Sequence, residues 1–151
     1  MKKLTWEMLI KLHSWSKQDY YVDLLTESMM KDGTDYLEIP DDEYEEAANV
    51  YNEQIEKENR LFRCTALNNE GMAMEKNGDI DGAIAAYEQN IKEGCTALHS
   101  FDRLAIIYRR RKEYSEEIRV VKKALEIYPQ MGYFLNRLAK AEELLGKSGE
   151  R

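Results

Sequence analysis

Residues 98–131 read LHSFDRLAIIYRRRKEYSEEIRVVKKALEIYPQM, and this stretch decides the fold. One apolar segment precedes the polar turn at 111–114, and a second apolar segment follows it. Shifting the sequence by 34 residues places the same pattern on residues 64–97, so that Leu67 falls on Phe101. A period of this length predicts helix–turn–helix units that stack on one another, because a single unit cannot bury its apolar face alone.

The composition of the chain is typical of a helical protein. Its 151 residues are 43% hydrophobic and 34% charged, and they include only 2 prolines, so turn-forming residues are scarce. Leu, Ile, Ala, Met, Glu and Lys dominate over Val and Thr, which favours helices over strands. A length near the ~150 residues of a typical domain predicts one domain or one short array.

Nothing in the sequence predicts contact with a membrane. No apolar run approaches the ~20 residues of a spanning helix, and the N-terminus lacks an apolar segment with a small-residue cleavage site. We therefore expect no membrane partner and a cytoplasmic location. The cysteine content agrees, because Cys64 and Cys95 are too few for a disulfide framework. We expect two thiols packed at helix termini in a reducing compartment, and we interpret the matching Cys-Thr-Ala-Leu segments as a coincidence.

No set of side chains predicts a metal site, a cofactor or catalysis. The two cysteines lie 31 residues apart without a CxxC spacing, and His13 and His99 belong to no paired-ligand pattern. The sequence also lacks a nucleophile beside a base, a glycine-rich phosphate loop and convergent carboxylates at a usable spacing. We therefore expect a protein that is not an enzyme and that holds no metal and no cofactor.

Residues 1–63 do not follow the 34-residue period. Two short helices are predicted in the first 30 residues, with Asp19 as the N-cap of the second. Pro40 disfavours helix in the residues before it, so that segment should be extended. A further helix should begin near Asp42, where acidic side chains suit the positive helix N-terminus, and end near Phe62. We interpret residues 1–63 as an acidic helical extension or a degenerate repeat, with an independent domain as the alternative.

Residues 64–146 resemble the tetratricopeptide repeat (TPR), a helix–turn–helix unit of about 34 residues with characteristic small and large positions. In the better copy, residues 98–131, the matching side chains are Phe101, Leu104, Ala105, Tyr108, Ala124 and Pro129. In the weaker copy, residues 64–97, they are Leu67, Gly71, Ala83 and Tyr87. The departures from the pattern are Glu70, Asn90, Cys95, Glu117 and Val121.

The resemblance implies a domain organisation and a fold. Residues 64–97 and 98–131 would be two repeats, 132–146 the capping helix that ends such arrays, and 147–151 a short tail. The expected fold class is all-α. About seven helices would form a short right-handed array of antiparallel helical hairpins.

The resemblance also implies where a partner binds, because the first helices of such repeats line a concave groove that accepts peptide segments. In this sequence the groove should be lined by Asn68, Asn69, Met72, His99, Asp102, Arg103, Ile106, Arg110, Asn136, Arg137 and Lys140. Four cations against one carboxylate favour an acidic partner or a C-terminal carboxylate. We expect a non-catalytic adaptor or scaffold that binds a protein or peptide. The alternative interpretation is that these side chains are solvated residues of ordinary helices.

Charge is unevenly distributed along the chain. Residues 1–60 carry 7 basic and 15 acidic side chains, whereas residues 98–151 carry 12 and 8. The net charge of −7 argues against nucleic acid as a partner, and the basic run at 109–112 suits a solvated helix C-terminus. The alternative function is a structural or regulatory homo-oligomer. In it, the acidic N-terminal half would occupy the basic groove of its own chain or of a neighbour.

Overall fold

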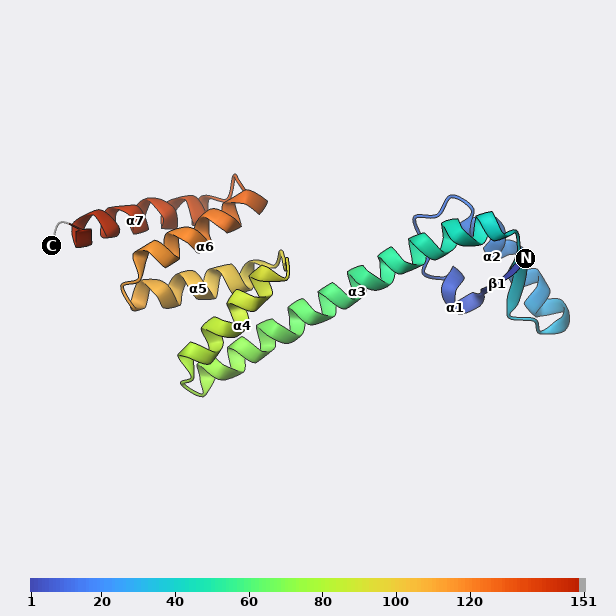
Figure 1. Cartoon of the computed structure of the whole chain (residues 1–151), viewed down its shortest axis with the longest axis horizontal. Helices are drawn as coiled ribbons and strands as arrows, with labels where there is room; N and C mark the ends of the chain where they lie inside the picture. The colour runs from blue at the N-terminus through green and yellow to red at the C-terminus, as the bar shows by residue number, and fades with distance from the viewer. Residues whose placement is uncertain (150–151) are drawn as a thin grey trace. The chain divides into compact units, whose positions relative to one another are not determined.

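The computed structural model describes residues 1–149, and in this part of the chain it contains seven helices and two strands (Figure 1). The elements are β1 (Lys2–Thr5), α1 (Trp6–Leu9), α2 (Gln18–Asp32), β2 (Tyr36–Ile39), α3 (Asp41–Lys76), α4 (Ile80–Lys92), α5 (Leu98–Arg110), α6 (Tyr114–Ile127) and α7 (Gly132–Gly149). The predominance of helix confirms the fold class in its coarse form. The chain divides into two compact units, Met1–Asn59 and Arg60–Arg151.

A small antiparallel sheet lies in the first unit. β1 pairs with β2 so that Leu4 is opposite Leu37 and Lys2 is opposite Ile39. Leu4 and Ile39 are both buried, and together with α1 and α2 they form the core of this unit. The extended segment before Pro40 is thus confirmed as β2. The sequence does not predict β1, because four residues with one apolar side chain carry too little alternation.

Two predicted helix boundaries are wrong. The helix expected to end near Phe62 runs on to Lys76, because residues 56–63 contain no glycine or proline and consist mostly of good helix formers. The N-cap of α2 is Lys17 and not Asp19. Asp19 instead lies in the first turn, where its negative charge still favours the helix N-terminus.

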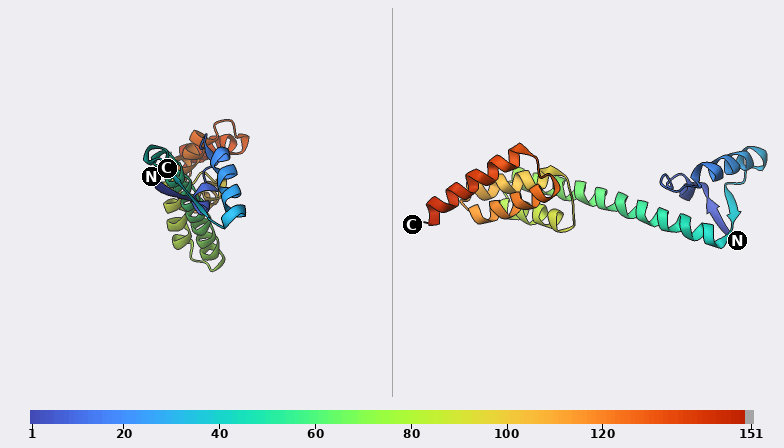
Figure 2. Two further views of the ribbon diagram at one scale, coloured as in Figure 1. Left: turned by 90° about the vertical axis from the view of Figure 1, so that its right-hand side faces the viewer. Right: turned by 90° about the horizontal axis from the view of Figure 1, so that it is seen from above.

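In the second unit, α4 packs on α5, α5 on α6 and α6 on α7, and successive helices run in opposite directions (Figures 1 and 2). The turn expected at 111–114 separates α5 from α6. Gly78 adopts a φ of 82° after α3, and Asp79 caps α4 by accepting a hydrogen bond from the Gly82 amide at 2.9 Å. The core of this unit is built from Ala83, Tyr87, Phe101, Leu104, Ala105, Ile107, Tyr108, Val120, Val121, Ala124 and Phe134.

The last helix covers this core, and the apolar stripe that the sequence predicts for it, Leu135, Leu138, Ala141 and Leu145, is correct in part. Ala141 is buried and Leu138 packs against the core, whereas Leu135 and Leu145 are 45% and 37% exposed. Phe134, which the predicted stripe leaves out, is buried as well. Phe134, Leu138 and Ala141 follow the i, i+4, i+7 spacing of one helix face.

No helix among the described residues is long and apolar enough to span a bilayer.

Candidate functional site

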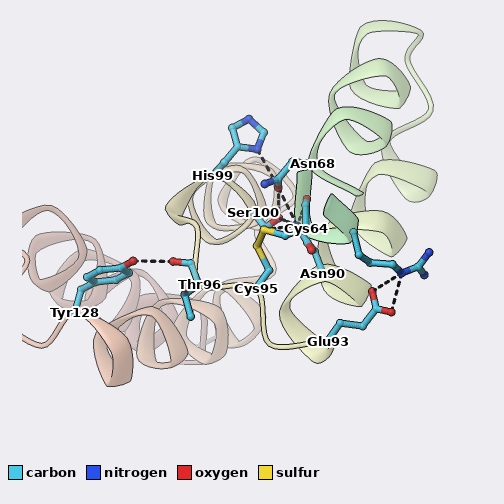
Figure 3. The surroundings of a disulfide bond; sticks show 10 residues. Cys64, Asn68, Asn90, Glu93, Cys95, Thr96, His99, Ser100 and Tyr128 are labelled. Atoms are coloured by element: carbon cyan, nitrogen blue, oxygen red, sulfur yellow. Dashed lines mark hydrogen bonds and ion pairs between the residues drawn. A yellow bond between two sulfur atoms is a disulfide. The ribbon is translucent and has the colours of Figure 1, made fainter. Parts of the chain in front are cut away.

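Side chains of three helices that are not consecutive in the sequence meet in the second unit. Between α3 and α5, the Nδ1 atom of His99 lies 3.4 Å from Oδ1 of Asn68, in the setting shown in Figure 3. Between α5 and α7, the Tyr133 hydroxyl donates to the carboxylate of Asp102. We name the surface formed by α3 from residue 68 onward, α5 and α7 the α3–α5–α7 face. All of the predicted groove residues lie on these three helices.

The predicted groove residues divide into two groups by exposure. The exposed group is Asn69, Met72, Arg110, Asn136 and Lys140. The half-buried group is Asn68, His99, Asp102, Arg103, Ile106 and Arg137. Met72 is the large apolar side chain of the exposed group, with 51% of its surface accessible. The exposed group is therefore the part of the predicted set that can meet a partner without rearrangement.

Arg103 is held within the unit by Glu75 of α3. Its Nη2 atom lies 2.6 Å and its Nε atom 3.0 Å from the two oxygens of that carboxylate, which also accepts a hydrogen bond from the Tyr87 hydroxyl at 2.7 Å. The contact with Arg103 lowers the pKa of Glu75, and the carboxylate raises the pKa of Arg103. Bidentate geometry makes this a strong pair, so the Arg103 charge is already neutralised.

The same arrangement recurs one helix further along the chain. Glu88 of α4 accepts a hydrogen bond from the Tyr108 hydroxyl of α5 at 2.7 Å and pairs with Arg119 of α6. In both clusters a glutamate binds a tyrosine from the next helix and an arginine from the helix after that. Burial is the main cause that raises the pKa of both tyrosines, followed by the hydrogen bond to glutamate.

Arg137, another predicted groove cation, is directed towards a buried carboxylate. Glu117 of α6 is fully buried, and its two oxygens lie 2.9 Å from Nε of Arg109 and 2.9 Å from Nη2 of Arg137. Arg109 also donates to the Arg137 carbonyl oxygen at 3.1 Å. The glutamate that departs from the TPR pattern therefore links α5, α6 and α7 by ion pairs.

Tyr133 is a surface residue of this face that sequence reasoning missed. It is 47% exposed, it binds Asp102, and the Arg137 guanidinium lies 5.8 Å from its ring centroid. Burial and the Asp102 carboxylate raise its pKa. The 34-residue period does not identify Tyr133, because this residue occupies no packing position of the repeat. An aromatic residue beside a predicted groove cation is the signal that could have identified it.

The expectation of two separate thiols is wrong. Cys64 of α3 and Cys95, in the loop before α5, form a disulfide with their Cα atoms 5.4 Å apart (Figure 3). Beside it, the buried Asn90 places Nδ2 3.1 Å from the Cys64 carbonyl oxygen, from Asn68 Oδ1 and from Ser100 Oγ. Asn90 and Cys95 are thus two departures from the TPR pattern that the structure uses to connect α3, α4 and α5. The sequence shows that Asn90 and Cys95 depart from the pattern. It does not show that Cys95 pairs with Cys64, because the fold brings the two cysteines together.

Comparison of the chain with protein-family models and with curated proteins finds no match.

Proposed function

We propose that the second unit is a non-catalytic adaptor or scaffold module that binds a peptide segment of another protein on the α3–α5–α7 face. The observation that carries this proposal is that side-chain contacts join α3 to α5 and α5 to α7, and that each of these three helices carries exposed polar, cationic or apolar side chains. Internal hydrogen bonds and ion pairs hold that surface together. The resemblance of residues 64–146 to TPR repeats supports it, since such repeats present a concave face of first helices to peptides.

The chemistry of the exposed group suggests the kind of peptide. The amides of Asn69 and Asn136 suit the backbone of an extended segment, and Met72 suits an apolar side chain. Arg110 and Lys140 supply positive charge, although Lys140 lies 3.5 Å from Glu143 of its own helix. An acidic peptide is therefore the proposed ligand, and its attraction depends on two exposed cations.

Self-association through the acidic first unit has less support. That unit carries 6 basic and 15 acidic side chains, so its charge is suitable. The cations that a carboxylate-rich partner would need most are occupied, however. Arg103 binds Glu75 and Arg137 binds Glu117, and breaking either pair would leave a half-buried charge without its partner. We therefore propose binding of another protein in preference to a homo-oligomer.

The proposed cytoplasmic location no longer rests on the cysteines. Stable disulfides are rare in the cytosol, where bonded cysteines are usually transient or redox-responsive. The Cys64–Cys95 bond fits a cytoplasmic protein only if it opens and closes there.

The experiment is a selection from a random linear peptide library against the whole immobilised chain, followed by affinity measurement on the recovered peptides. The face variant is Arg110→Glu with Lys140→Glu. The matched control is Lys122→Glu with Lys123→Glu, which reverses the same charge on exposed positions of α6. We expect the face variant to lose about tenfold in affinity and the control to stay within about twofold at moderate salt. Equal losses, or recovery of no peptide, would refute the proposal.

A further inference from the structure

The disulfide stands next to the place where α3 and α5 contribute to the proposed binding face. Cys64 lies one helical turn before Asn68 on α3. Cys95 precedes His99 by the same number of residues and lies in the loop before α5, whose N-cap is Ala97. The covalent bond therefore fixes the separation of two predicted groove residues, Asn68 and His99, whose side chains are in contact (Figure 3).

The other contacts at this end of the face are neutral hydrogen bonds. Asn68 Oδ1 accepts from Asn90 Nδ2 and from the Ser100 hydroxyl, and it lies beside His99. Neutral hydrogen bonds contribute modestly to stability, because each replaces a bond with water. Within the described part of the chain, Asn90 Oδ1 is also buried without a hydrogen-bond partner. The cluster is therefore poorly suited to hold α3 against α5 without the covalent bond.

The other end of the same helix contact is held differently. Glu75 of α3 binds Arg103 of α5 through two charged hydrogen bonds, and the Tyr87 hydroxyl adds a third. Charge-assisted bidentate pairs are the stronger kind. Loss of the disulfide should therefore open the Asn68 end while the Glu75 end stays closed.

We propose that the Cys64–Cys95 disulfide is a redox switch of the α3–α5–α7 face: bonded, it holds Asn68 against His99 for peptide binding, and reduced, it releases them. The inference rests on the proposed function, whose site it regulates. It also gives the disulfide a use in a compartment that contains thiol reductants.

The chemistry is thiol–disulfide exchange with a small dithiol. A thiolate of the dithiol attacks the Cys95 sulfur, the S–S bond breaks, and Cys64 leaves as a thiolate that takes up a proton. The second thiol of the reagent then attacks the mixed disulfide and releases Cys95 as a thiol. Two electrons and two protons pass to the protein, and the dithiol becomes a cyclic disulfide. The neighbours Gly94, Thr96 and Ala97 are exposed, so a small reagent can approach through this loop.

The test compares the whole oxidised chain with the same chain reduced by a dithiol. Thiol alkylation and mass measurement first establish the state of the cysteines. Hydrogen exchange then reports the backbone. We expect exchange around 65–69 and 98–101 to accelerate about tenfold more after reduction than exchange around Glu75 and Arg103. The double variant Cys64→Ser with Cys95→Ser should match the reduced chain and give no response to the dithiol.

Binding of the library-selected peptide is measured on the same samples, and about tenfold weaker binding is expected after reduction. Equal affinity in both states overturns the switch and leaves the proposed function intact. Binding in neither state overturns the proposed function, and the exchange data then decide whether the disulfide controls the Asn68–His99 contact. Free thiols in the air-oxidised chain, or identical exchange in both states, overturn the inference directly.

Discussion

Replacement of Glu117 by alanine should destabilise the second unit strongly, although alanine is the usual residue at the matching position of the TPR pattern. Glu117 is fully buried and accepts hydrogen bonds from Arg109 and Arg137. The substitution removes the carboxylate that lies between two guanidinium groups, which the fold has largely withdrawn from water. The cost arises from the arginines left behind, because a charge that loses its buried partner loses most of the stabilisation that compensated its desolvation.

The structure sets the size of the effect. Removing one member of a buried ion pair costs about 3–5 kcal/mol. The side chains of Arg137 and Arg109 are 14% and 28% exposed, so part of each freed charge can rehydrate. We therefore expect the lower end of that range, about 3 kcal/mol. For a unit of this size, such a loss corresponds to a fall of roughly 12 to 24 °C in unfolding temperature.

The distribution of tryptophan allows the two units to be followed separately. Both tryptophans, Trp6 and Trp15, lie in the first unit, whereas far-ultraviolet circular dichroism reports helices of both. In urea, Glu117→Ala should move the transition seen by circular dichroism to lower concentration. The transition seen by tryptophan fluorescence should stay in place, because Glu117 belongs to the other unit.

A triple variant distinguishes this explanation from simple loss of packing. Glu117→Ala with Arg109→Met and Arg137→Met removes all three charges, and replacement of buried ion clusters by apolar side chains is often neutral or stabilising. We expect it to recover most of the lost stability. A single variant that loses less than about 1 kcal/mol, or a triple variant less stable than the single one, would refute the reasoning.

Three further predictions follow from the second unit. The Cys64–Cys95 disulfide closes a loop of 31 residues, so its reduction should lower the free energy of unfolding of the second unit by about 3–4 kcal/mol. Urea titrations with and without reductant would show no shift if the bond does not form. Gly71→Ala should destabilise the unit despite the better helix propensity of alanine, because the new Cβ would lie 2.3 Å from the Tyr87 ring. Gly146→Ala, where the Cβ would meet open space, should be neutral or stabilising by up to about 1 kcal/mol. Thermal melts that rank the two variants the other way would contradict the packing argument. Because burial raises the pKa of Tyr87, the free energy of unfolding should hold below pH ~10 and fall as the pH rises further. Tyr87→Phe should weaken that fall. If the free energy of unfolding of this variant fell as steeply at alkaline pH as that of the natural chain, Tyr87 would be excluded as the cause.

The sequence contained enough information to predict the second unit and less for the first. Apolar periodicity and the turns near Gly78 and Lys112 predict α4, α5, α6 and α7, since each helix has one buried stripe and a clear end. The first unit depends on pairing between residues 2–5 and 36–39, which are far apart in the chain. Such pairing leaves little local pattern in a four-residue strand. The end of α3 was missed for the opposite reason, because nothing in residues 56–63 stops a helix.

The sequence did not predict the electrostatics of the candidate site. The repeat spacing assigns Arg103 and Arg137 to the groove, and in the structure they lie on α5 and α7. Their partners Glu75 and Glu117 stand on other helices at separations of 28 and 20 residues, which no 34-residue alignment brings together. Counting cations from the sequence therefore overstates the positive charge that the face offers to a partner.

The glutamate clusters connect helices that are second neighbours in the chain. A regular array is held by apolar contacts between neighbouring helices, and these leave every interface equivalent. In this chain, Glu75 and Glu88 each bind a tyrosine of the next helix and an arginine of the one after, and Glu117 joins α5 to α7. Contacts of this kind reach across one helix to the second neighbour. They couple helices that apolar packing alone connects only through an intermediate, so α3, α5 and α7, the helices of the proposed binding face, are held in a fixed relation to one another.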